Sequence, residues 1–236
     1  MSELRSSASS WKLLYRIGEL SALIVGALYT IELVGVAITG LPPTTAIGFF
    51  TLLQNNRLLG LFDLFLLDIP ATAFQIPIIL ALYVSLRHAD ESQMTVAAIL
   101  GYIGIAEYFS ANTALSMLSL SDQYASASTD SQRSLFLALG EQLLFLNTST
   151  GSFIGYTFIA IAGLIISFVM LRSGIFNRVT ACLGIVGNLL ELGPPSQFVP
   201  RQSYQYFVIL IALGGVLLII WYFLVARRLH QLEQSG

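Results

Sequence analysis

Six long apolar segments constrain this chain more than any other feature of its sequence. They occupy residues 17–40, 58–86, 94–118, 151–171, 179–192 and 204–226. A helix that crosses a bilayer needs about 20 mostly apolar residues, and all of these segments except 179–192 reach that length. We therefore expect an all-α fold, a polytopic integral membrane bundle of six transmembrane helices.

The composition supports this expectation, because the chain has too few charges to cover a soluble surface. Of 236 residues, 11 are Lys or Arg, 13 are Asp or Glu, and 56% are hydrophobic. A soluble domain usually carries about 25% charged residues. These values exclude a soluble enzyme, a disordered tail and a nucleic-acid-binding protein. The single Cys182 excludes an internal disulfide framework and a cysteine-based zinc site.

The basic residues are distributed unevenly between the loops, and this predicts the orientation of the chain. With a cytoplasmic N-terminus, those on the cytoplasmic side are Arg5, Lys12, Arg16, Arg87, Arg172, Arg178, Arg227 and Arg228. Only Arg57, Arg133 and Arg201 fall outside. This asymmetry follows the positive-inside rule for a cell-membrane protein with both termini in the cytoplasm. We expect a cytoplasmic segment at residues 1–16, one membrane domain at 17–228 and a cytoplasmic tail at 229–236.

Several acidic residues fall in the outer half or at the midplane of the predicted bundle. They are Glu32, Asp63, Asp68, Glu107, Glu141 and Glu191. A charge within hydrocarbon costs several kcal/mol unless it is paired, protonated or facing water. We therefore expect a polar cavity open to the outside, with Glu107 and Asp68 at its core and Glu32 and Asp63 nearer its mouth. Simple exposure at a helix end explains Asp63, Glu141 and Glu191 about equally well.

Other polar residues occupy positions compatible with such a cavity. Asn188 lies three residues before Glu191 and shares a helical face with it. Asn112 continues the polar face beyond Glu107, and Arg57 or Arg201 could pair with one of the acids. The candidate ligand- or proton-binding residues are therefore Glu107, Asp68, Asp63, Glu32, Asn112, Asn188, Glu191 and Arg57.

The histidines argue against a metal or cofactor within the membrane. His88 and His230 both fall in predicted cytoplasmic segments, where solvated side chains are as good an interpretation as any other. The membrane segments therefore lack a histidine pair for haem, a di-iron cluster or a zinc hydrolase. We assign no catalytic residue, no metal and no cofactor.

Three stretches together resemble a known family. They are the sequence Asn-Arg-Leu-Leu-Gly-Leu-Phe-Asp-Leu at residues 56–64, the turn Leu-Arg-Ser-Gly-Ile-Phe-Asn-Arg at 171–178, and Trp221 near a basic C-terminus. The chain resembles, over roughly residues 17–228, the bacterial six-helix membrane proteins grouped as domain of unknown function 4386. Asn177 departs from the family's usual Pro, and Gly215 from a common acid. The resemblance implies an architecture, with Arg57 and Asp63 as family-like positions, and no established activity.

Three functional hypotheses follow from these patterns. The leading one is a non-enzymatic module that binds or passes a small solute, lipid or proton through the outward-facing acidic cavity. The second is an intramembrane enzyme that uses paired carboxylates on a lipid or isoprenoid, which requires two carboxyl groups close together. The third is an accessory subunit of a larger membrane complex. The expected partners are membrane lipids, a small-molecule or lipid ligand and other subunits in a homo- or hetero-oligomer, without nucleic acid.

Overall fold

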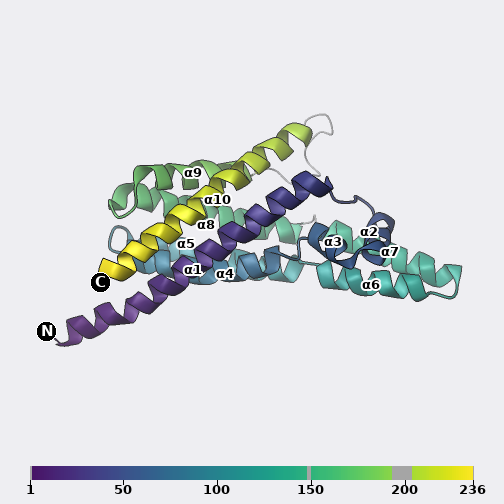
Figure 1. The fold of residues 1–236 in the computed structure, drawn as a ribbon, viewed down its shortest axis with the longest axis horizontal. Coiled ribbons are helices and arrows are strands. Elements are labelled where there is room, and N and C mark those ends of the chain that lie inside the picture. Colours follow the sequence, from purple (N-terminus) through teal and green to yellow (C-terminus); the bar gives the residue numbers. More distant parts are fainter. Residues whose placement is uncertain (1, 148–149, 193–203, 236) are drawn as a thin grey trace.

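The computed structural model describes residues 2–147, 150–192 and 204–235, and helices are the only regular structure in them (Figure 1). The helices are α1 (Ser2–Thr39), α2 (Ala46–Asn55), α3 (Arg57–Asp63), α4 (Asp68–Leu86), α5 (Glu91–Ala111), α6 (Ala114–Ser126), α7 (Asp130–Asn147), α8 (Thr150–Ser173), α9 (Arg178–Glu191) and α10 (Tyr204–Ser235). The all-α fold class expected from the sequence is confirmed.

Five stretches of helix are long and apolar enough to cross a membrane. They lie in α1, α4, α8 and α10 and in the combined length of α5 and α6. The helix α9 has 14 residues, which corresponds to a length of about 21 Å. It packs against α8 and α10 in the same bundle. Large apolar side chains cover the outside of the long helices, such as Ile38, which is 79% exposed, and this is the surface that lipid requires.

The segment 58–86, expected as one transmembrane span, consists of two helices. A turn at residues 64–67 separates α3 from α4, and within it Phe65 adopts a φ of 58°, which ends an α-helix. Pro70 lies in the first turn of α4, where a missing N–H leaves no helical hydrogen bond unmade. The break places Asp68 at the first residue of α4.

The polar stretch 119–134 lies between two of the apolar segments and is largely helical. It belongs to the end of α6 and the start of α7. One face of α6 is buried against α2, since the hydroxyl of Ser121 donates to the carbonyl of Phe50 over 3.3 Å. This tertiary contact stabilises a helix that composition alone did not indicate.

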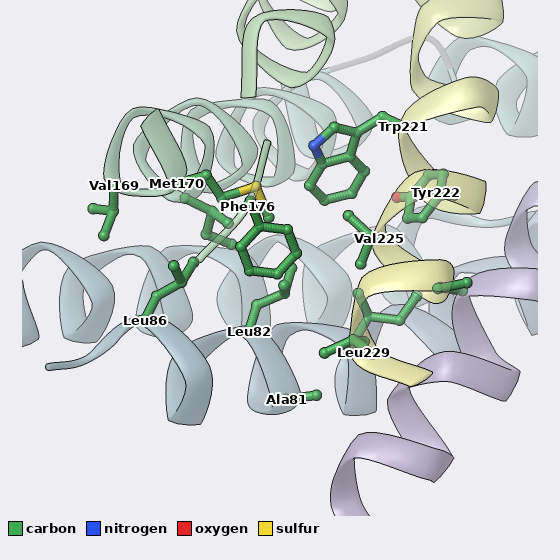
Figure 2. Packing of buried hydrophobic residues seen from close by; sticks show 14 of the residues in the cluster. Ala81, Leu82, Leu86, Val169, Met170, Phe176, Trp221, Tyr222, Val225 and Leu229 are labelled. Atoms are coloured by element: carbon green, nitrogen blue, oxygen red, sulfur yellow. The ribbon is translucent and has the colours of Figure 1, made fainter. Parts of the chain in front are cut away.

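Two clusters of buried apolar residues organise the molecule. The larger one lies between α1, α4, α5, α8, α9 and α10, and Figure 2 shows Leu82, Phe176 and Leu229 converging in it. The smaller one joins α2 to α6 through Phe49, Phe50 and Met117 and lies at the end of the bundle opposite the termini (Figure 1).

The two termini lie at the same end of the bundle (Figure 1). There, α1 and α10 pack along each other, and Glu19 of α1 lies 3.0 Å from His230 near the end of α10. Arg87, after α4, stacks over Trp11 with its guanidinium 5.6 Å from the ring centre. The turn between α8 and α9 also reaches this end, because its Phe176 packs in the cluster with Leu229.

Candidate functional site

A pair of carboxyl groups joins α1 to α4. Glu32 of α1 and Asp68, the first residue of α4, are hydrogen-bonded to each other through their side chains. Asp68 is 8% exposed and Glu32 is partly buried. The Oε1 atom of Glu32 is buried and receives no hydrogen bond from an amide, a hydroxyl or a basic side chain in the described residues. The pair is therefore held close together without a neutralising Lys or Arg among those residues.

Two tyrosines donate hydrogen bonds to this pair. The hydroxyl of Tyr108, on α5, donates to Oδ2 of Asp68 over 2.9 Å, and that of Tyr156, on α8, reaches the same oxygen over 3.4 Å. The two rings meet edge to face, with centres 5.3 Å apart. Close contact between α5 and α8 holds both rings, because a Cβ on Gly104 would lie 2.8 Å from the carbonyl oxygen of Gly155.

The polar network extends from the carboxyl pair towards α10. Tyr29 lies one helical turn before Glu32 on α1, and its hydroxyl accepts a hydrogen bond of 2.9 Å from the side-chain amide of Gln75. The ring of Tyr29 packs 6.0 Å from that of Tyr222 on α10. Gln75 is 5% exposed and lies two turns along α4 from Asp68. Tyr29 and Gln75 thus form a second polar contact between α1 and α4, close to the carboxyl pair.

An internal cavity of about 30 Å³ lies at the inner end of this network. Its polar lining comes from Gln75, Asn188, Trp221 and Tyr222. The indole nitrogen of Trp221 and the hydroxyl of Ser167 are both buried, and neither has a hydrogen-bond partner in the described residues. Apolar side chains make up most of the remaining lining, and the volume is enough for one or two water molecules beside these polar groups.

Small residues give these polar side chains their space. A Cβ on Gly184 would collide with the hydroxyl of Ser167 and the indole nitrogen of Trp221, and a Cβ on Gly163 would collide with the amide of Asn188. The Nδ2 atom of Asn188 donates to the carbonyl of Gly184 over 2.7 Å. The glycines of α8 and α9 therefore fix Asn188 at the cavity.

Glu191 lies one turn beyond Asn188 at the end of α9. Its carboxyl is close enough to both Asp68 and Tyr222 for an electrostatic interaction with each of them. The Oε1 atom of Glu191 would be 3.3 Å from a Cβ on Gly214 of α10. The structure thus places a third acid near the Glu32–Asp68 pair.

Glu107 does not join this group. It is partly buried on α5, and no hydrogen bond or ion pair involves it within the described residues. Its neighbour Tyr108 instead faces Asp68, and consecutive residues of an α-helix point about 100° apart. Asn112, one turn further along, is hydrogen-bonded to the hydroxyl of Tyr108 and donates weakly to the carbonyl of Phe65 over 3.5 Å.

The remaining candidates lie near α2 and α6, away from the pair. Arg57 forms an ion pair of 2.7 Å with Asp122 of α6, in which the side chains are 62% and 51% exposed. Asp63 ends α3, where its Oδ1 atom is buried without a partner in the described residues. Glu141 accepts a hydrogen bond of 2.9 Å from the first backbone N–H of α2, at Ala46. Arg201 lies outside the described residues.

Sequence reasoning did not select Tyr29, Gln75, Tyr156 or Tyr222 for this site. Helical spacing could have indicated two of them. Tyr29 lies three residues before Glu32 and Gln75 lies seven after Asp68, so each shares a helix face with one acid of the pair. Tyr156 and Tyr222 carry no such signal, since only the packing of α8 and α10 brings them to the site.

Comparison with known proteins identifies one family. The model described as Domain of unknown function (DUF4386) matches residues 13–226. No curated protein and no solved structure matches the chain significantly.

Proposed function

The chain belongs to the DUF4386 family, and from its Glu32–Asp68 pair we propose that it is a non-enzymatic membrane module that binds and passes protons. The carrying observation is the hydrogen bond between the two carboxyl groups. Ionised carboxylates only accept hydrogen bonds, so a bond between two carboxyl groups requires a proton on one of them. Two like charges held this close also favour a shared proton.

The surroundings of the pair support a proton as the ligand. The tyrosines Tyr108 and Tyr156 donate to Oδ2 of Asp68, which stabilises that oxygen as an acceptor. Gln75, which contacts Tyr29 beside the pair, also lines a cavity of about 30 Å³, which has room for water. A lipid or a larger solute needs a pocket of about 300 Å³ or more.

The expected topology is part of this proposal. Six crossings, by α1, α3 with α4, α5, α8, α9 and α10, would return the chain to the side on which it began. The shared end of the two termini and the presence of Arg87 beside Trp11 at that end support a cytoplasmic position for it. The carboxyl pair then lies in the half of the bundle that faces outwards.

Orientation can be tested with single cysteines on a Cys182→Ser background. Ser128, in the turn between α6 and α7, lies at the end opposite Ser235, which closes α10. A membrane-impermeant maleimide added to intact cells should label Ser128→Cys and leave Ser235→Cys unlabelled until the cells are opened. Labelling of Ser235→Cys in intact cells would contradict the proposed topology.

The proton site can be tested by infrared difference titration of the purified protein. The wild type should show a protonated carboxyl band that responds to pH, and Asp68→Asn or Glu32→Gln should remove or shift it. Glu107→Gln is the matched control, because Glu107 lies on a membrane helix without contacting the pair. In liposomes with an internal pH dye, the two site variants should slow proton entry by about tenfold or more. Unchanged bands and fluxes in both site variants would overturn the proposal.

The same pair favours a second candidate, an intramembrane enzyme that uses the carboxyls as acid and base on a lipid or isoprenoid. Its requirement of two close carboxyl groups is met by Glu32 and Asp68. Incubation of proteoliposomes with membrane lipids, followed by mass spectrometry, separates the two candidates. A product that disappears in Glu32→Gln and Asp68→Asn would favour the enzyme.

An apolar groove of about 360 Å³ on α9 and α10 supports the accessory-subunit hypothesis, because a partner helix would bury its apolar surface there. Val179, Cys182 and Val186 line it, away from the carboxyl pair. Co-purification of a stoichiometric partner in mild detergent would favour that role, and the partner should be lost when Val186 is replaced by Asp.

A further inference from the structure

A second polar cluster lies at the other end of α1, where it packs against the end of α10. The Nδ1 atom of His230 lies 3.0 Å from Oε2 of Glu19 and 3.8 Å from Oε2 of Glu233. One ligand atom from each residue lies within 4.8 Å of the other two. An imidazole nitrogen and two carboxylate oxygens from two helices therefore converge on one point.

The charges of this cluster are unbalanced. The carboxylates are largely shielded, with side chains 17% exposed for Glu19 and 25% for Glu233. Among the described residues, neither carboxylate has an Arg or Lys within 4.0 Å, and their one basic partner is His230. Two carboxylates thus share one imidazole, and these nitrogen and oxygen donors are of the kind that a divalent transition-metal ion binds.

The helix packing holds the three residues in register. Gly18 precedes Glu19 and allows close packing, because a Cβ there would lie 2.6 Å from Cβ of Ala81 and 3.1 Å from Cδ1 of Leu229. His230 follows Leu229, which is fully buried. His230 and Glu233 are three apart on α10, so they project from the same side of the helix.

The second imidazole nitrogen also has a partner. The side-chain amide of Gln234 lies 2.8 Å from Nε2 of His230. Rotation of this amide presents its oxygen to an Nε2–H, which leaves Nδ1 free to bind a cation. Such a hydrogen bond on the far nitrogen orients metal-binding histidines in general.

We propose that Glu19, His230 and Glu233 bind one divalent transition-metal ion of the Zn²⁺ class, which links α1 to α10. Zinc bonds to nitrogen and carboxylate oxygen are about 2.0–2.2 Å long, so tetrahedral ligand atoms stand about 3.4 Å apart. The observed 3.0 and 3.8 Å bracket that spacing. The imidazole favours zinc over Mg²⁺ or Ca²⁺, and three protein ligands leave a fourth position for water.

The test is calorimetric titration of the full chain, free of any histidine tag, with Zn²⁺ in detergent at pH 7.5. The wild type should bind one equivalent, and His230→Ala and Glu19→Gln should each weaken binding by at least about tenfold. His88→Ala is the matched control, because His88 lies at the same end of the bundle and outside the cluster. It should bind zinc as the wild type does.

Thermal unfolding supplies a second measurement. Zn²⁺ should raise the unfolding temperature of the wild type and of His88→Ala, and leave that of His230→Ala unchanged. Without metal, the three proteins should unfold within a few degrees of each other, which shows that His230→Ala is folded. Absence of wild-type binding, equal binding in His230→Ala, or full competition by Mg²⁺ would each overturn the proposal. This proposal and the proton site can fail independently, because they share no residue.

Discussion

Glu32 and Asp68 share a hydrogen bond between their carboxyl groups, although the helices α2 and α3 separate them in sequence. The contact exists because α1 and α4 pack against each other and because α4 begins at Asp68. Tyr108 and the turn at Phe65 hold Asp68 in this position, and each can be tested by substitution.

Replacing Tyr108 by Phe should destabilise the protein and alter the carboxyl band. The change removes the 2.9 Å hydrogen bond to Asp68 while keeping the ring. A hydrogen bond to a charged group contributes about 1.5–3 kcal/mol. Thermal unfolding in detergent measures the loss, and Tyr83→Phe serves as the control because Tyr83 makes no side-chain hydrogen bond within the described residues. Equal melting temperatures for Tyr108→Phe and the wild type would contradict the assigned role.

Replacing Gly184 by Ala should destabilise the bundle by about 1–3 kcal/mol, because the added methyl overpacks the interior. The new Cβ would collide with Ser167 and Trp221. Gly215→Ala is the matched control, since its Cβ would meet only Oε1 of Glu191 at an ordinary 3.7 Å. Unfolding can be followed by tryptophan fluorescence, to which Trp221 and Trp11 both contribute. A Gly184→Ala protein as stable as the control would show that the contact is looser than the structure indicates.

Replacing Phe65 by Gly should relieve strain in the turn before α4. Phe65 has a φ of 58°, and the left-handed region costs a residue with a side chain about 1–2 kcal/mol relative to its usual conformation. Its side chain is 41% exposed, so little packing is lost. We expect a higher unfolding temperature, with Phe62→Gly as the destabilised comparison because Phe62 contacts Gly35 of α1. A fall in the melting temperature of Phe65→Gly would argue against strain at this turn.

Removing the ion pair between Arg57 and Asp122 should change stability by about 1 kcal/mol or less, because exposed pairs contribute little. Both side chains are more than half exposed. A double-mutant cycle with Arg57→Ala and Asp122→Ala measures the coupling, which should fall further in high salt. A coupling well above this value would indicate that Arg57 has a larger structural role.

Part of the candidate site was accessible from the sequence. Glu32 and Asp68 stood out because an unpaired acid is costly inside an apolar segment, so an acid there indicates a partner that the sequence does not name. Glu107 satisfied the same criterion equally well, yet it lies on another side of α5 from the pair. Depth along a helix follows from residue number, whereas the direction of a side chain relative to its neighbours depends on how the helices pack.

The apolar segments by themselves determined an all-α membrane protein, since in lipid only internally hydrogen-bonded helices satisfy the backbone of such segments. The motifs at residues 56–64 and 171–178 also sufficed to identify its family. Tertiary structure alone decided that α4 starts at Asp68, that Tyr108 and Tyr156 converge on it, and that Glu19 meets His230. These contacts join residues far apart in the chain, and their geometry is set by close packing at glycines such as Gly104 and Gly18, which no local pattern encodes.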